Sequence, residues 1–279
     1  MSEFGFTIIT VCYNSELTLT DTMESVMKQD YRPIEYIIID GHSTDNTLQI
    51  IENYEPLFFD KGIEFKWISE ADRGLYEAMN KGIQMAKREI IGIINSDDRL
   101  ADDSVSIVAS AFRKDNTLEI VHGDLEVENQ NLNHKEPRRH RGETDLTLLC
   151  RYMIVNHPSV FIKKEIYSKF GMFDLDYGTV SDWELMCRFY SKNANFRYIP
   201  FVLVHFRAGG ISSPFGFNKV LELFKVRRKY TSPHIALMLF FTNTLRYLSQ
   251  IAGLSDMMNK ILPLPWRESI HYYRSKGRF

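Results

Sequence analysis

The sequence predicts an α/β fold with a mostly parallel central sheet, and three observations support this class. Short apolar runs alternate with amphipathic helical segments through the first half of the chain. A single helical segment separates each apolar run from the next, which favours right-handed crossovers between parallel strands. The runs themselves contain few polar residues, as expected of strands that are buried on both faces.

The expected elements of the first half follow in a regular order. Apolar runs predict strands over 6–13, 36–40, 65–69, 90–95 and 118–127. Apolar residues recurring at helical spacing predict helices over 19–27, 48–54, 75–85 and 104–112 between these strands.

The pattern changes after residue 127. Residues 128–145 are polar and basic and predict a loop. Strands over 159–162 and 197–206, with a helix over 182–190 between them, predict a smaller mixed region, and helical segments follow from Phe215. We therefore expect a nucleotide-binding type of α/β domain over 1–214 and a helical C-terminal extension over 215–279.

Composition indicates a folded protein in a reducing compartment. The 279 residues are 44% apolar and 25% charged, which suits one large domain or one domain with an appendage. The three cysteines (Cys12, Cys150 and Cys187) show neither disulfide nor zinc spacing. No secretory signal or run of about 18 apolar residues is visible, so we expect a cytoplasmic protein.

The C-terminal extension differs from the rest of the chain in charge. Residues 215–279 contain 11 Lys/Arg and 3 Asp/Glu, a net charge of +8, whereas the first 214 residues carry −10. Phe217, Val220, Leu221 and Phe224 lie at helical spacing among basic residues. Such a helix either lies on an anionic membrane, at the inner face of the cell membrane, or packs on the α/β domain. Nucleic-acid binding is disfavoured, because no known reading module accompanies the charge.

The segment IINSDD (93–98) is the strongest functional signal. It places Asn95, Asp97 and Asp98 after an apolar strand, at the edge where open α/β sheets bind ligands. Clustered carboxylates repel one another and are best tolerated beside a divalent cation. A metal-assisted nucleotide site is therefore one interpretation, and a solvated turn with a helix N-cap is the other.

The earlier strand ends add further polar residues at the same edge. Tyr13 follows the first strand and offers a ring for stacking on a base, or a rim residue that packs on its own loop. Asp40 ends the second strand, where an acid accepts hydrogen bonds from a base or a ribose. Asp72 follows the third strand and is either a ligand contact or a helix N-cap. Neither a GxGxxG nor a GxxxxGK[ST] loop is present, which argues against a dinucleotide or P-loop site.

In this order the motifs resemble glycosyltransferase family 2, and they are most similar to its bacterial members that assemble surface polysaccharides. The resemblance is carried by TIITVCYN (7–14), DGHSTDNT (40–47), EADRGLYEAMNKG (70–82) and NSDD (95–98). It continues through residues 155–174, 180–189 and 204–213, and covers about three quarters of the chain. It implies a GT-A fold, a nucleoside-diphosphate sugar donor that we expect to be UDP-linked, and a saccharide or lipid-linked saccharide acceptor.

The resemblance also implies roles for individual residues. Tyr13 and Asp40 correspond to the residues that hold the base, and Asp72 lies by the nucleotide. The family's DxD motif falls on Asn95-Ser96-Asp97, whose first position faces the ribose and whose last ligates manganese or magnesium on the diphosphate. Asn95 departs from the usual Asp, so Asp97 is the expected metal ligand and Asp98 the reserve.

The acid of VSDWELMCRF (180–189) matches the catalytic base of the family, which gives Asp182. Inverting transfer is a single displacement in which the acceptor hydroxyl loses its proton as it attacks. Glu184 is the competing candidate for the base, and an N-cap is the structural alternative for Asp182. His157 and His205 are possible acceptor-pocket and metal-shell residues, respectively, or ordinary loop and strand-end histidines.

Two other functions compete with an inverting glycosyltransferase. A nucleotidyltransferase that makes an activated sugar also uses an α/β sheet with metal-binding carboxylates. Such an enzyme would normally show a glycine-rich basic loop after the first strand, which CYNSELTLTD (12–21) does not provide. A catalytically silent nucleotide-sugar-binding module is favoured by Asn95 and disfavoured by the presence of both Asp97 and Asp182.

Overall fold

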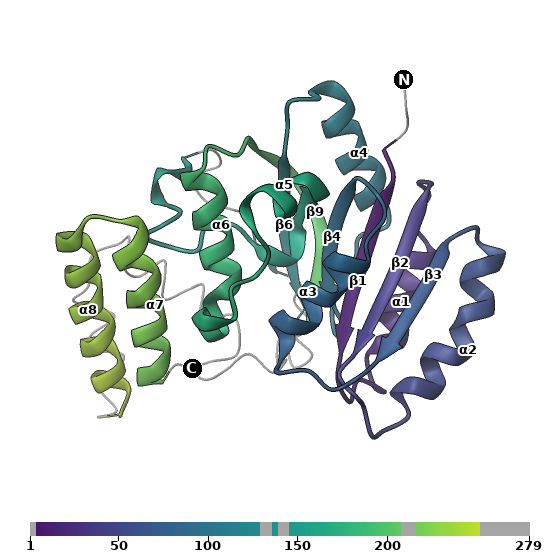
Figure 1. Ribbon diagram of the computed structural model, residues 1–279, viewed down its shortest axis with the longest axis horizontal. Coiled ribbons are helices and arrows are strands. Elements are labelled where there is room, and N and C mark those ends of the chain that lie inside the picture. Colours follow the sequence, from purple (N-terminus) through teal and green to yellow (C-terminus); the bar gives the residue numbers. More distant parts are fainter. Residues whose placement is uncertain (1–3, 129–135, 139–144, 208–215, 252–279) are drawn as a thin grey trace.

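The computed structural model describes residues 4–128, 136–138, 145–207 and 216–251. A nine-stranded mixed sheet forms its centre, in the order β3-β2-β1-β4-β8-β6-β9-β5, with β7 paired to β6. Helices cover both faces of the sheet, and a helical hairpin lies at one side of the molecule (Figure 1). The predicted α/β class, with a largely parallel central sheet, is confirmed.

The first half of the sheet is parallel and is formed by the strands that the apolar runs predicted. These strands are β1 (Phe6–Cys12), β2 (Ile34–Asp40), β3 (Glu64–Ser69) and β4 (Ile90–Asn95). Every side chain of β1 and β2 is buried, as expected of strands covered on both faces.

Helices on the two faces of the sheet pack through alternating strand residues. One face carries α1 (Leu19–Met27), α2 (Thr47–Asp60) and α4 (Ser104–Lys114), which pack against β1 residues such as Ile8. The other face carries α3 (Leu75–Met85), α5 (Lys164–Phe170) and α6 (Ser181–Ser191), which pack against β1 residues such as Ile9. At Gly82 a Cβ would lie 2.5 Å from Ile9, so only glycine lets α3 approach β1 this closely.

The second half of the sheet is mainly antiparallel. Its strands are β5 (Arg99–Leu100), β6 (Ile120–Glu128), β7 (Glu136–Arg138), β8 (Val160–Lys163) and β9 (Phe196–Arg207). The sequence did not predict β5, β7 or α5. The two strands are only two and three residues long, and β7 lies within the polar stretch expected to be a loop.

The C-terminal extension begins with a hairpin of two helices, α7 (Phe217–Tyr230) and α8 (Pro233–Ile251). Val220, Leu223 and Val226 of α7 are buried in the same core cluster as α6. The predicted apolar stripe of α7 is therefore divided, because Val220 packs inward while Phe217 and Leu221 remain exposed. Packing on the α/β domain, one of the two alternatives from the sequence, holds for this helix.

The remaining expectations for the extension have separate outcomes. The boundary between 1–214 and 215–279 stays a prediction, and it falls in a stretch outside the described residues. Any further helical segment expected from Phe215 onward and beyond α8 also lies outside the described residues and stays a prediction. Of the helices that the structure describes, none combines the length and the apolar character needed to cross a bilayer.

Candidate active site

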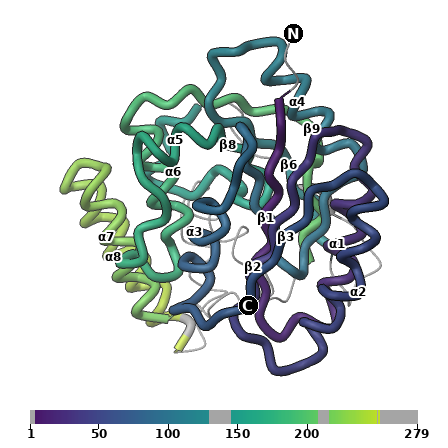
Figure 2. The backbone as a smooth tube through the Cα atoms, turned by 45° about the vertical axis from the view of Figure 1, so that its right-hand side comes forward, coloured from purple at the N-terminus to yellow at the C-terminus, as the bar shows by residue number. Residues whose placement is uncertain are grey.

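The parallel register brings the predicted site residues to one edge of the sheet. Cys12 lies opposite Asp40, Asp40 lies opposite Ser69, and Val11 lies opposite Asn95. We call this edge, formed by the ends of β1 to β4 and the loops that follow them, the carboxyl edge. It lies at the end of these strands remote from the N-terminus (Figure 2).

Asp40 is fully buried at the centre of the carboxyl edge. Its Oδ2 accepts hydrogen bonds from Ser69 Oγ at 2.7 Å and Ser43 N at 3.0 Å, and its Oδ1 accepts from Ser43 Oγ and from Cys12 Sγ at 3.6 Å. Burial and the nearby Asp40 carboxylate raise the pKa of the Cys12 thiol, which keeps it protonated as a donor. The carboxylate thus joins the ends of β1, β2 and β3.

Tyr13 and Asp72 meet across Gly41. A Cβ on Gly41 would lie 2.9 Å from Asp72 Oδ2 and 3.5 Å from the Tyr13 ring. Tyr13 is 54% exposed, so one side of its ring is open to solvent. Asp72 Oδ1 accepts a hydrogen bond from Gly74 N at 2.7 Å, which orders the turn before α3. The helix-capping alternative is wrong for Asp72, because the N-cap of α3 is Gly74 and no described side chain caps that helix. The Oδ2 of Asp72 lies toward Gly41.

Asn95, Asp97 and Asp98 follow β4 with different environments. Asp98 is fully buried and accepts from Asn95 Nδ2 at 3.2 Å and from the backbone N–H of Arg207 at 3.1 Å. It therefore has a structural role that links β4 to the end of β9. Asn95 Oδ1 is buried and accepts no hydrogen bond within the described part of the chain. Asp97 is half-buried in the short loop between β4 and β5.

One contact joins this loop to the loop after β1, and another joins Arg207, which binds Asp98, to α1. Ser96 Oγ lies 2.8 Å from Ser15 Oγ, which joins the loop after β1 to the loop after β4. Arg207 donates to Asp21 of α1 at 2.6 Å. The sequence analysis did not single out Ser15 or Asp21, although the strand-end position of Ser15 was a signal for it.

The residues of the carboxyl edge fit a metal ion only in part. Among the residues described, no three His, Cys, Asp or Glu side chains gather as a metal site. Asp97 offers a carboxylate, and Asn95 offers a buried amide oxygen that accepts from none of the residues with described positions. Magnesium commonly takes one or two carboxylates and completes its shell with water and substrate phosphates. The residues therefore suit an ion that binds together with a diphosphate.

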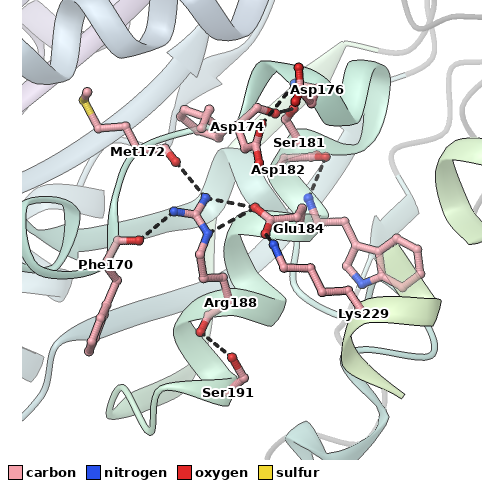
Figure 3. Close-up of polar contacts among 12 residues, drawn as sticks. Phe170, Met172, Asp174, Asp176, Ser181, Asp182, Glu184, Arg188, Ser191 and Lys229 are labelled. Atoms are coloured by element: carbon pink, nitrogen blue, oxygen red, sulfur yellow. Dashed lines mark hydrogen bonds and ion pairs between the residues drawn. The ribbon is translucent and has the colours of Figure 1, made fainter. Parts of the chain in front are cut away.

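Asp182 lies at the start of α6 and is partly exposed. Its Oδ1 accepts from the N–H of Trp183 at 2.8 Å, and its Oδ2 makes no hydrogen bond to the residues described (Figure 3). The preceding segment is fixed by the bond from Ser181 Oγ to the carbonyl of Asp174 at 2.6 Å. Asp182 is therefore held at its backbone while one carboxylate oxygen remains available.

Glu184, the competing candidate, is fully buried and enclosed by cations. Arg188 lies 2.9 Å from its carboxylate and Lys229 of α7 lies 3.0 Å away (Figure 3). Tyr230 donates to it at 2.5 Å. Burial raises the pKa of Glu184, but the hydrogen bonds from Tyr230, Arg188 and Lys229 outweigh it and lower the pKa. Glu184 is thus enclosed by its partners, whereas Asp182 is partly exposed to solvent.

The two histidines make contacts of their own. His157 is buried and packs edge-on against Phe173, with 5.4 Å between ring centroids. His205 Nδ1 lies 2.6 Å from Glu126 Oε2 on the neighbouring strand β6. The roles that the sequence left open for these two residues stay predictions.

Comparison with known proteins decides the family. The model of the family described as Glycosyl transferase family 2 matches residues 7–195, more than half of the chain. The chain belongs to glycosyltransferase family 2. The predicted resemblance is thereby confirmed.

Two curated relatives in glycosyltransferase family 2 differ in how much of their length the chain matches. The chain is 27% identical over 211 residues to a PGL/p-HBAD biosynthesis glycosyltransferase of Mycobacterium bovis, covering 75% of this chain and 79% of the relative. It is 35% identical over 127 residues to a poly-beta-1,6-N-acetyl-D-glucosamine synthase of Staphylococcus epidermidis, covering 45% of this chain but only 30% of that protein.

Solved structures of low identity confirm the GT-A fold. S. aureus TarS 1–349 in complex with UDP-GlcNAc matches with a TM-score of 0.63 at 15% identity, covering 95% of this chain and 78% of that chain. The mannosyltransferase PcManGT from Pyrobaculum calidifontis, in complex with GDP-Man and Mn2+, matches with a TM-score of 0.61 at 17% identity, covering 98% and 85%. The chain spans 38% of the longer TarS structure.

The segment that carries Asp182 is attached to α3 by contacts that the sequence analysis missed. Asn80 donates to the carbonyl of Phe173 and accepts from its N–H, both at 2.9 Å. Tyr76 of the same helix donates to the carbonyl of Thr179 at 3.3 Å. Because α3 begins just after Asp72, these bonds fix the base candidate relative to the carboxyl edge. Asn80 lies within the AMNKG motif, so the motif itself was the available signal.

Glu184→Gln is expected to lower the free energy of unfolding by about 3 kcal/mol, because Arg188 and Lys229 would lose their buried counter-charge. Urea unfolding measures this, with Glu165→Gln on the exposed side of α5 as the matched control. The lowered pKa means that the wild-type contribution is full above the ordinary value of 4.5 and is lost as pH falls through the folded-state value. Unfolding curves that coincide with wild type at pH 7 would show that the cluster contributes little.

Proposed function

We propose that this chain is an inverting, metal-dependent glycosyltransferase that moves a sugar from a UDP-linked donor to a saccharide or lipid-linked saccharide acceptor. The observation that carries the proposal is the convergence of Tyr13, Asp72 and Asn95 at the carboxyl edge of a family 2 domain. Open α/β sheets bind ligands at this edge.

Each residue of the edge has a proposed task toward the nucleotide. The exposed ring of Tyr13 stacks on the base. Asp40 holds the base site by fixing the turn at Gly41, and Asp72 lies across that turn. Asn95 Oδ1, buried and without a donor among the described residues, accepts from a ribose hydroxyl.

Asp97 is the proposed ligand of a manganese or magnesium ion whose coordination shell the donor diphosphate would complete. Asp98 stays the reserve ligand. Such an ion would neutralise the charge that develops on the leaving diphosphate. Mn2+ beside GDP-Man in PcManGT supports this role, and Asn95 in place of a carboxylate predicts modest metal affinity in the absence of nucleotide.

Asp182 is the proposed catalytic base. Its free Oδ2 accepts the proton of the acceptor hydroxyl as that oxygen attacks the anomeric carbon from the side opposite the diphosphate. The C–O bond to the diphosphate breaks as the new glycosidic bond forms, so the anomeric configuration inverts. The backbone bonds through Asn80 and Ser181 hold this carboxylate in place.

The biological setting is proposed from the relatives. PGL/p-HBAD biosynthesis, poly-beta-1,6-N-acetyl-D-glucosamine synthesis and the UDP-GlcNAc complex of TarS support a role in cell-envelope polysaccharide or glycoconjugate assembly. We propose that the protein is cytoplasmic and works at the inner face of the membrane. A silent nucleotide-sugar-binding module is the second candidate, favoured by Asn95 alone.

Asp97→Ala is expected to abolish the metal-dependent part of UDP binding, because the ion would lose its protein carboxylate. Isothermal titration with UDP, with and without manganese, measures this directly. Asp102→Ala, an exposed acid a few residues further on, is the matched control and should bind as wild type does. Equal affinity of Asp97→Ala and wild type in manganese would remove Asp97 from the metal site.

Asp182→Asn is expected to lower turnover of the nucleotide sugar by about 100-fold or more, with donor affinity nearly unchanged. Release of UDP is the measurement, and the exposed Asp176→Asn in the preceding turn is the matched control. Full activity of Asp182→Asn together with an inactive but folded Glu184→Gln would identify Glu184 as the base. Absence of UDP release from wild type with every donor that binds would favour the silent module.

A further inference from the structure

The outer helix of the C-terminal hairpin presents a wide apolar face to solvent. Six large apolar side chains of α8 are between 48% and 67% exposed. Their spacing places them on one side of the helix, over a length of about 20 Å. We call this surface the α8 face, and it consists of Leu237, Met238, Phe241, Leu245, Leu248 and Ile251.

The contacts of α8 with α7 do not use this face. Phe240 packs on Phe224 of α7 with 4.8 Å between ring centroids, and Tyr247 packs on Phe217 at 5.9 Å. Ala236 and Leu239 are buried on the same helix. The packing of α8 on α7 therefore uses other apolar residues of α8, and the α8 face takes no part in it.

The hairpin is also strongly basic. Residues 216–251 contain six Lys/Arg and one acid, Glu222. Glu222 is turned toward the α/β domain, where it accepts from Thr179 Oγ1 at 2.6 Å. Lys225, Arg228 and Lys229 lie at the exposed surface in the last turns of α7, next to the start of α8. Lys225 and Lys229 contact the α/β domain, but the hairpin as a whole carries a net charge of +5 from its six basic residues and one acid. An apolar face on a helical hairpin of net positive charge complements an anionic lipid surface.

We propose that the α8 face inserts into the interfacial region of an anionic lipid bilayer. The helix lies along the surface, since none of the described helices is long and apolar enough to cross a membrane. Lipid fits this face better than a second copy of the chain does. An interface between two proteins carries about one hydrogen bond per 100–200 Å², and the six side chains of the α8 face can form none of these bonds at their usual strength. Of the polar residues on the same side of α8, Thr244 already donates within the helix to the carbonyl of Phe240 at 2.9 Å, which leaves His234 at the start of the helix.

The sequence suggested that the basic helix α7 meets the membrane mainly through its charge. We instead place the main contact on α8 and on its apolar side chains. The basic residues of α7 are partly used within the protein, as Lys225 donates to the carbonyl of Asp176 at 2.8 Å and Lys229 pairs with Glu184. Apolar insertion by α8 should therefore supply most of the affinity, and the cations a smaller part. That the membrane then brings a lipid-linked acceptor to Asp182 rests on the proposed function, whereas the contact itself does not.

The test is sedimentation of the full chain with vesicles of phosphatidylcholine and phosphatidylglycerol. Wild type is expected to pellet with the vesicles, and most of the binding should persist at high salt because burial of apolar surface is not screened. In the double variant Phe241→Glu/Leu245→Glu, the affinity for the vesicles should fall by about tenfold or more. Phe59→Glu on α2, at the opposite side of the molecule, is the matched control and should bind as wild type does (Figure 1).

Further measurements separate this proposal from other occupants of the α8 face. Wild type should be monomeric by sedimentation velocity without lipid, and the double variant should melt at the wild-type temperature because both side chains are exposed. A dimer that the double variant dissociates would assign the face to a second copy. A large fall in melting temperature would assign it to residues 252–279 of the chain itself.

Vesicle binding also has outcomes that would overturn the proposal directly. Equal binding of wild type and the double variant would do so, as would complete release of wild type by salt. UDP release from a nucleotide sugar in solution should be unchanged in the double variant. Failure of the proposed function would appear there, without affecting vesicle binding.

Discussion

The carboxylate of Asp40 is buried where three parallel strands end, and the shape of the carboxyl edge depends on the hydrogen bonds that it accepts. A buried charge is tolerated only when it is hydrogen-bonded, and Cys12, Ser43 and Ser69 supply the donors from β1, the loop after β2, and β3. These bonds hold the turn at Gly41, over which Tyr13 and Asp72 meet. The side chains proposed to meet the nucleotide are therefore arranged by a carboxylate that lies beneath them.

A second buried carboxylate connects the edge to the rest of the molecule. Glu184 joins α6 to α7 through Lys229 and Tyr230. It also pairs with Arg188, which donates to the carbonyls of Phe170 at the end of α5 and of Met172 just after it, both at 2.7 Å. The helix α6, which carries Asp182 in its first turn, is thus braced on one side by the C-terminal hairpin. The two acids of α6 therefore differ in environment, because Glu184 is enclosed by cations whereas Asp182 is partly exposed at the start of the helix.

The central elements and the strand-end residues could be predicted from the sequence, because buried parallel strands are apolar throughout and end in register. Asp40, Asp72 and Asn95 became visible as a group for that reason. The choice between Asp182 and Glu184 was not decided, because most of α6 is buried and apolar spacing does not separate its faces. Arg188, four residues after Glu184, was the local sign of an ion pair.

Contacts between distant segments could not be predicted in the same way. The hydrogen bonds between Asn80 and Phe173 join residues 93 positions apart. The AMNKG motif marks Asn80, but nothing local in the sequence indicates its partner. The same holds for the division of α7, whose apolar residues face both the core and solvent. Local periodicity shows that a helix is amphipathic, but its packing partner depends on the whole chain.

A crystal structure of the protein with UDP and Mn2+ would test the central claim most directly. The account predicts the uracil ring against Tyr13, the ribose beside Asn95, and the metal between Asp97 and the diphosphate at the carboxyl edge. Nucleotide bound elsewhere on the molecule, or at this edge with its diphosphate remote from Asp97, would contradict it.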